Sequence, residues 1–202
     1  MTSLTFYGGV GETDKKVQEI VEKSIRQAIR NFGENQEKFK NEQQFQEFLY
    51  YILADELKKE NMLFAKTGNG RDLILLLREK ITNKKYKRSN AKKKTHGRLD
   101  IAILNSSASN QDFPKNGSDL EKIPLSVGIE IKLNKTDKSW EDEMNHIFKK
   151  LNDEITLTAA GRYIIFLSTR AKFKFANGYR KWLNEHPRVK VYSNKNGLES
   201  TR

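Results

Sequence analysis

Hydrophobic and polar residues follow two different periods along this chain. Apolar residues recur at helical spacing over residues 13–33, 41–57, 136–158 and about 175–183. Thr13 can cap the first of these segments, and Gly33 follows its last apolar residue. The pattern therefore predicts four amphipathic helices.

Runs of branched and aromatic residues predict strands at residues 98–104, 125–133, 162–168 and 189–192. Residues 162–168 are apolar on both faces, as in a central strand. Residues 105–124 are rich in Ser, Asn, Gly and Pro, which predicts a long hairpin loop between the first two strands. The order of elements predicts an α/β fold with a mixed sheet.

Periodicity does not decide the structure of residues 71–81, RDLILLLREKI. This segment is apolar nearly all round and fits either a buried helix or a central strand. We favour a helix.

A length of 202 residues fits one domain with a hydrophobic core. We expect a single domain over residues 1–202, with a helical extension at 1–37, a core at 38–192 and a polar tail at 193–202.

The net charge of +12 is concentrated in one segment. Residues 80–98 contain nine Lys or Arg and no acid, so the rest of the chain contributes only +3. A local positive charge of this kind attracts phosphate groups, and the alternative is a solvated lysine loop. The predicted nucleic-acid contacts within it are Lys84, Lys85, Lys87, Arg88, Lys92, Lys93, Lys94 and Arg98.

Composition argues against several other classes of protein. The chain has no cysteine, so disulfide frameworks and thiolate metal sites are excluded. Its three histidines do not have the spacing of a zinc hydrolase. No apolar run approaches the length of a membrane span, and the start does not resemble a secretory signal. We expect a cytoplasmic protein without membrane contact.

The segment GIEIKLN, residues 128–134, places charges inside an apolar strand. Alternate side chains share a face, so Glu130 and Lys132 lie about 7 Å apart on the face opposite Ile129 and Ile131. The same alternation in RLDIAIL, residues 98–104, puts Leu99, Ile101 and Ile103 towards the core and Asp100 away from it. Pairing of the two strands then brings Asp100, Glu130 and Lys132 onto one face.

These residue types suit phosphodiester hydrolysis. Carboxylates bind Mg²⁺ together with waters and substrate phosphate. A lysine can orient the attacking water or offset negative charge in the transition state. Nearby carboxylates keep it protonated, which argues against a general base.

At these residues the sequence resembles the PD-(D/E)xK nuclease superfamily. Asp100 matches the family's first acid and Glu130-Ile131-Lys132 its second motif, while Leu99 replaces the usual proline. The resemblance implies a restriction-endonuclease-like mixed central sheet flanked by helices, here with an extra N-terminal helix. It also implies a Mg²⁺-dependent endonuclease, with Mn²⁺ able to substitute.

The resemblance implies metal ligands as well. Asp100, Glu130 and the main-chain carbonyl of Ile131 would bind the ion. Many relatives add a glutamate from the helix before the sheet, for which we prefer Glu42 and keep Glu56 as the alternative.

Other functions fit the same residues. Lys132 could form a salt bridge with Glu130 or Asp100 at a solvated sheet face. The chain could also be a non-catalytic nucleic-acid-binding module, or an interaction protein for an acidic partner. Among substrates DNA is favoured over RNA, and a homodimer would supply the two active sites that cutting both strands requires. Restriction, defence and repair all remain open as biological roles.

Overall fold

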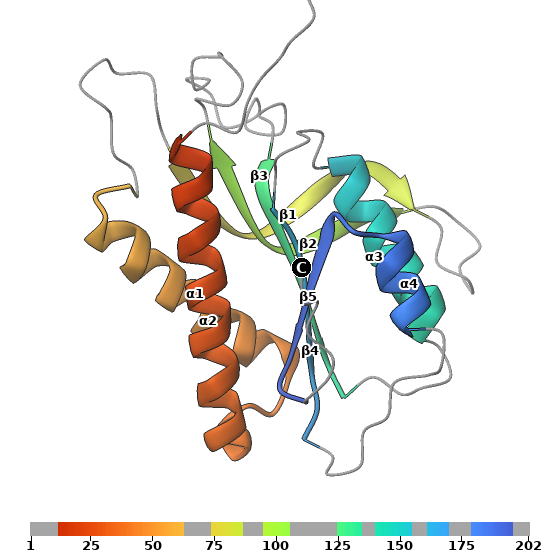
Figure 1. Ribbon diagram of the computed structural model, residues 1–202, viewed down its shortest axis with the longest axis horizontal. Helices are drawn as coiled ribbons and strands as arrows, with labels where there is room; N and C mark the ends of the chain where they lie inside the picture. The colour runs from red at the N-terminus through yellow and green to blue at the C-terminus, as the bar shows by residue number, and fades with distance from the viewer. Residues whose placement is uncertain are drawn as a thin grey trace, which may run out of the picture.

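Five strands form one mixed sheet with helices on both faces in the part of the chain that the structure describes (Figure 1). The structure is a computed structural model, and it describes residues 12–62, 74–86, 95–105, 125–134, 140–154, 161–169 and 179–195. Its helices are α1 (Glu12–Glu34), the 3₁₀ helix η1 (Gln36–Lys38), α2 (Glu42–Lys59), α3 (Trp140–Glu154) and α4 (Tyr179–Glu185). Its strands are β1 (Ile74–Tyr86), β2 (Thr95–Asn105), β3 (Leu125–Leu133), β4 (Gly161–Leu167) and β5 (Val189–Ser193).

The strands lie in the order β1-β2-β3-β4-β5. The β1–β2 and β2–β3 pairs are antiparallel, and the β3–β4 and β4–β5 pairs are parallel. Each parallel connection contains a helix, as parallel pairing requires a crossover. The predicted mixed α/β architecture and the antiparallel pairing of segments 98–104 and 125–133 are confirmed.

The prediction of a helix at residues 71–81 is wrong. Residues 74–86 form β1, an edge strand paired with β2 from Ile74–Asn105 to Tyr86–Thr95. The backbone N–H and C=O groups of this strand that face β2 are satisfied by pairing with it. The periodicity of apolar residues within the segment does not indicate that pairing. Residues 71–73 lie outside the described part.

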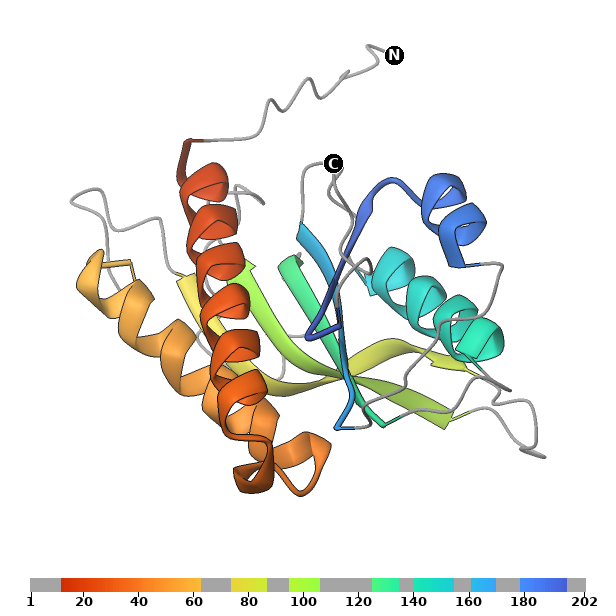
Figure 2. The same ribbon diagram turned by 60° about the horizontal axis from the view of Figure 1, so that its bottom comes forward.

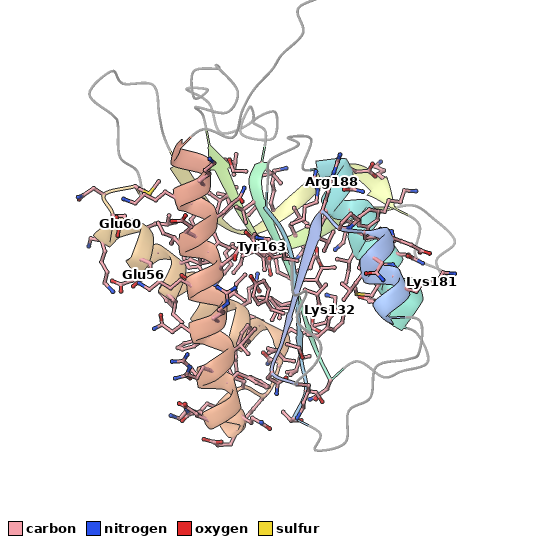
Figure 3. All side chains as sticks on the ribbon, viewed as in Figure 1. Glu56, Glu60, Lys132, Tyr163, Lys181 and Arg188 are labelled. Carbon is pink, nitrogen blue, oxygen red and sulfur yellow. The ribbon has the colours of Figure 1, made fainter. Side chains whose placement is uncertain are left out.

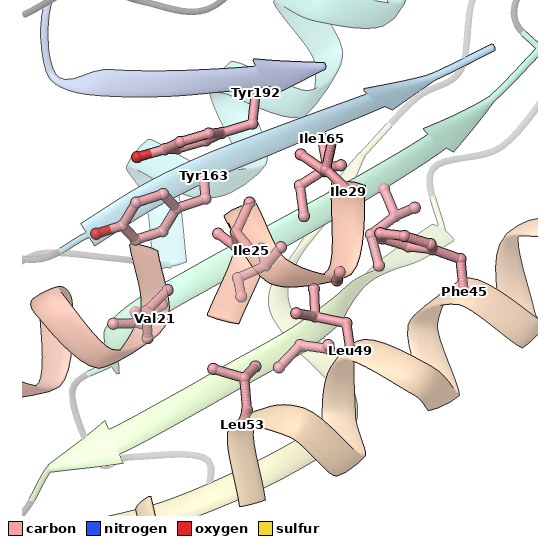
Figure 4. Packing of buried hydrophobic residues seen from close by; sticks show 14 of the residues in the cluster. Val21, Ile25, Ile29, Phe45, Leu49, Leu53, Tyr163, Ile165 and Tyr192 are labelled. Carbon is pink, nitrogen blue, oxygen red and sulfur yellow. The ribbon is translucent and has the colours of Figure 1, made fainter. Parts of the chain in front are cut away.

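One face of the sheet is covered by α1 and α2 (Figures 1 and 2). Apolar side chains of both helices pack against odd-numbered residues of β3 and β4 in a single cluster (Figure 4). The rings of Phe32, Phe39 and Phe45 contact one another with centroids 5.5–5.8 Å apart. Helix α1 therefore shares one hydrophobic core with α2 and the sheet.

The opposite face is covered by α3 and α4 (Figure 2). Met144, Ile147 and Leu151 of α3 pack with Trp182 of α4 against a second cluster of strand residues. β4 is buried along its whole length, which confirms that it is a central strand. None of the helices in the described residues is long and apolar enough to cross a membrane.

Candidate active site

Two charged side chains of β3, Glu130 and Lys132, point to the face that α3 covers. Strand alternation places them opposite Ile129 and Ile131, which belong to the cluster beneath α1 and α2. Glu130 is 1% exposed and Lys132 is 9% exposed. The alternative of a salt bridge on a solvated sheet face is right about the ion pair, which lies at 3.6 Å, and wrong about the solvent, because both charges are buried between the sheet and a helix.

Strands β2 and β3 separate beside Asp100. Their ladder ends at the pair Ile101–Ile129, so Asp100 and Glu130 are the next positions on the two strands. Here Oδ2 of Asp100 accepts a 2.6 Å hydrogen bond from the backbone N–H of Ile131. We call the ends of β2 and β3 beyond the Ile101–Ile129 pair, residues 95–100 and 130–133, the fork.

The alternation of β2 breaks at Asp100. Leu99 packs in the cluster beneath α3 and α4, whereas Ile101 packs beneath α1 and α2. Glu79, which lies opposite Asp100 in the β1–β2 register, has a left-handed φ of 61°. Local irregularities of this kind re-aim side chains. The prediction that Leu99 shares a face with Ile101 and Ile103 is therefore wrong.

Helix α2 supplies two polar side chains to the fork. The side chain of Asn41 caps the helix and defines its start. Glu42 and Gln46 are four residues apart and so lie on one side of the helix. Oε1 of Glu42 accepts a 3.1 Å hydrogen bond from the N–H of Leu133, and Nε2 of Gln46 donates to the carbonyl of Asp100. Both contacts satisfy backbone groups at the point where the strands part.

Glu56, the other candidate for a third acid, lies elsewhere. It pairs with Lys23 at 2.5 Å and with Lys59 at 3.0 Å. Figure 3 shows it on the part of α2 remote from Lys132. Of the two glutamates, Glu42 therefore reaches the fork and Glu56 does not.

Lys132 is surrounded by carboxylates. Its Nζ donates a 2.9 Å hydrogen bond to the carbonyl of Ile131. It lies 3.6 Å from Glu130, 3.7 Å from Glu42 and 4.0 Å from Glu143. Burial disfavours the ammonium, but the neighbouring carboxylates outweigh that effect and raise the pKa of Lys132 to about 12. Lys132 is therefore a cation at neutral pH.

Asp100 is held in an environment that opposes its charge. Burial, and then the nearby Glu130 carboxylate, raise the pKa of Asp100 to about 7. Lys132, the N–H of Ile131 and Lys150 act in the opposite direction without cancelling the effect. The effect of Glu130 agrees with the register, in which Asp100 and Glu130 are facing positions on β2 and β3.

Helix α3 adds two charged groups that the sequence reasoning missed, Glu143 and Lys150. Lys150 is 7% exposed, and its Nζ lies 2.5 Å from Oε1 of Glu130 and 2.9 Å from the carbonyl of Arg98. The two residues share a helix side with the buried Ile147, from which they are four and three positions away. That spacing was available as a signal, but a lysine on an apolar stripe is ordinarily a flanking residue whose head reaches solvent.

The basic segment is only partly described. Lys84 and Lys85 lie on β1, and Arg98 lies on β2. Lys85 and Arg98 are exposed, and Arg98 pairs with Glu79 at 3.4 Å. The remaining predicted contacts, Lys87, Arg88, Lys92, Lys93 and Lys94, lie outside the described residues.

The donor set of the fork fits a hard divalent cation. The available ligands are carboxylate and carbonyl oxygens, which Mg²⁺ prefers, and it commonly takes only one or two carboxylates. Around the fork four carboxyl groups face two ammonium groups, so negative charge is in excess even when Asp100 is protonated. Over the described residues, no group of three or more His, Cys, Asp or Glu is arranged to hold a metal ion. A site here would therefore rest on Asp100, Glu130 and main-chain oxygen.

A groove of about 550 Å³ adjoins the fork. Its walls come from the start of α2 and the end of β3 and are formed by Lys40, Asn41, Glu42, Gln43, Leu133 and Asn134. Because Glu42 also contacts Lys132 and Leu133, the groove gives solvent a route to the edge of the charged cluster.

Comparisons with known proteins identify no relative. No family model matches the chain, and neither the curated proteins nor the solved structures contain a significant match.

Proposed function

We propose that this chain is a metal-dependent nuclease that hydrolyses phosphodiester bonds. The observation that carries the proposal is the grouping of the buried Glu130 and Lys132 with the half-buried Asp100 where β2 and β3 part. Buried charges are costly unless they are paired or coordinate a metal. A cluster with more carboxylates than cations retains unneutralised charge that a divalent cation would offset.

In the proposed mechanism Asp100, Glu130 and the carbonyl of Ile131 would hold one Mg²⁺, which Mn²⁺ could replace. When bound, the ion lowers the pKa of a coordinated water and offsets charge on the phosphate. Glu42 is the candidate for an additional acid, since it lies 3.7 Å from Lys132 at the mouth of the fork.

Lys132 contributes positive charge. With a pKa of about 12 it cannot accept a proton at neutral pH, so it is not the general base. One of its three N–H donors is used on the carbonyl of Ile131. The nearest carboxylates lie at ion-pair distances of 3.6–4.0 Å, so the other donors can turn to a phosphate oxygen or the attacking water.

The proposal extends to fold and substrate. The mixed sheet, with an Asp on one strand and Glu-x-Lys on its antiparallel neighbour, is compatible with the restriction-endonuclease-like fold. The basic segment at residues 80–98 would contact the nucleic-acid backbone, with DNA favoured over RNA. We expect activity in the cytoplasm, and a homodimer if both strands of a duplex are cut.

Incubation of plasmid and oligonucleotides with Mg²⁺ or Mn²⁺, beside a chelator control, tests the activity. Asp100→Ala and Glu130→Ala should abolish metal-dependent cleavage and leave the fold intact. Asp55→Ala and Glu56→Ala, which remove acids of α2 outside the fork, serve as matched controls. Full cleavage by both fork variants would reject the proposal.

The basic segment also supports a second candidate, a non-catalytic nucleic-acid-binding module. Binding by such a module would not depend on the carboxylates of the fork. Binding of oligonucleotides without cleavage under any metal condition would favour it over the nuclease.

A further inference from the structure

Lys150 makes the shortest contact to Glu130 among the described residues, yet it lies outside the motif on β3. Its Nζ is 2.5 Å from Oε1 of Glu130, whereas Nζ of Lys132 is 3.6 Å from Oε2. The two carboxylate oxygens of Glu130 therefore face different cations. Lys150 engages one oxygen, and the other points to the part of the fork that Lys132 occupies.

Nζ of Lys150 also donates a 2.9 Å hydrogen bond to the carbonyl of Arg98. Arg98 precedes Asp100 by two residues on β2, and Glu130 is on β3. Lys150 thus joins the two strands at a level where they no longer pair with each other. A side chain from α3 therefore bridges the strands that carry the two proposed metal ligands.

Stability alone is a weak reason to keep this contact. A buried ion pair surrounded by apolar residues is often no more stable than a hydrophobic pair of the same volume. Leu151 and Ile147, which neighbour Lys150 on α3, are part of the apolar cluster and show that this face of the helix accommodates hydrophobic residues. The alternative explanation for a buried lysine at position 150 is that its charge fixes the position of Glu130, a proposed metal ligand.

We propose that Lys150 is a positioning residue of the fork. It holds Oε1 of Glu130 and the carbonyl of Arg98, and so sets the separation of Asp100 and Glu130 and reserves Oε2 of Glu130 for one divalent cation per chain. This inference rests on the proposed function. Residues that orient a metal ligand in this way typically contribute about 10–100-fold to metal affinity or activity.

Mn²⁺ titration by calorimetry of the full chain, without nucleic acid, tests the inference. Wild type should bind one ion, and Lys150→Met should raise the dissociation constant about 10–100-fold. Lys149→Met is the matched control, because it makes the same change one position earlier at an exposed site and should leave affinity unchanged. Equal affinity in Lys150→Met and wild type would overturn the inference, as would two ions per wild-type chain.

Crystals of wild type soaked with Mn²⁺ provide a second test that does not depend on folding of the variant. The ion should contact Oε2 of Glu130 while Nζ of Lys150 stays within hydrogen-bonding distance of Oε1. Displacement of Lys150 by the ion would overturn the inference. If wild type binds no Mn²⁺ in either experiment, the metal-dependent nuclease fails as well. If Asp100→Ala abolishes binding and Lys150→Met does not alter it, only the role of Lys150 is rejected.

Discussion

The two faces of the sheet differ in how they are filled. Beneath α1 and α2 the contact is formed by a continuous apolar cluster that includes three mutually packed phenylalanines. Beneath α3 the apolar cluster adjoins a group of buried charges at the fork. The first face provides stability through burial of apolar area. The second holds charges at a cost in stability, which is expected of a functional site.

The largest effect is expected from truncation of the apolar face. Phe45→Ala should lower the free energy of unfolding by about 3–5 kcal/mol, because Phe45 is fully buried and the helix cannot close the resulting cavity. Tyr51→Ala on the same helix is the control; Tyr51 is 69% exposed, so the change should stay within about 0.5 kcal/mol. Urea denaturation measures both, and similar losses would show that the apolar face is not the stabilising one.

Under the proposed nuclease function, a change at the charged face should affect catalysis instead. Lys132→Met should reduce the rate of metal-dependent cleavage about 10²–10³-fold, the usual loss when one donor to a transition state is removed. Lys181→Met, at an exposed position of α4, should cleave at the wild-type rate. Single-turnover cleavage assays provide the measurement. A rate within twofold of wild type for Lys132→Met would remove this residue from the mechanism.

The proposed nucleic-acid binding should depend on the basic segment rather than on either face. Neutralisation of Lys92, Lys93 and Lys94 should weaken nucleic-acid binding and reduce the slope of log K against log salt by up to about 2.7, at about 0.9 per phosphate contact. Fluorescence anisotropy over a series of salt concentrations measures the slope. An unchanged slope would identify this segment as a solvated loop.

The smallest expected effect is the loss of stability that Asp100 causes when no metal ion is bound. Unfolded Asp100 should titrate near its ordinary pKa of 3.8, and folded Asp100 near 7. Between these values only the folded chain keeps the proton, so Asp100 causes stability to fall as pH rises from about 4 to 7. Burial of Asp100 and the charge of Glu130 raise its pKa. Lys132, the N–H of Ile131 and Lys150 lower it by a smaller amount.

Asp100→Asn removes this loss and can still accept the hydrogen bond from Ile131. With chelator at pH 8 the variant should be more stable than wild type by at least about 1 kcal/mol, or about 2–4 °C in Tm, since one pKa unit corresponds to about 1.4 kcal/mol. At pH 4 the two proteins should melt together. Thermal melts at both pH values test this, and a less stable variant at pH 8 would contradict the assigned electrostatics.

Much of the fold was predictable because several segments carry a clear period. The helix predicted at 41–57 corresponds to α2 (Glu42–Lys59), and the strand predicted at 125–133 corresponds to β3 (Leu125–Leu133). Segment 71–81 was assigned wrongly because its apolar residues fit both periods, and only pairing with β2 distinguishes them.

The candidate site was predictable in part. Alternation along β3 placed Glu130 and Lys132 on one face, but it did not reveal that α3 covers that face. Alternation also failed at Leu99, where an irregular backbone beside Asp100 breaks the two-residue period. Lys150 was missed because its contacts lie 20 and 52 residues away along the chain.

The sequence by itself determined the main helices, most of the strands, the antiparallel partnership of the two motif strands and the concentration of positive charge in one segment. These properties depend on the order of neighbouring residues, which sets local periodicity and charge. Only the tertiary structure decided that β1 is a strand, that Glu130 and Lys132 are buried, that Glu42 rather than Glu56 reaches the fork, and that Lys150 bridges β2 and β3. Each of these depends on which distant segments pack together, because backbone groups and charges removed from water must find partners wherever the fold brings them close.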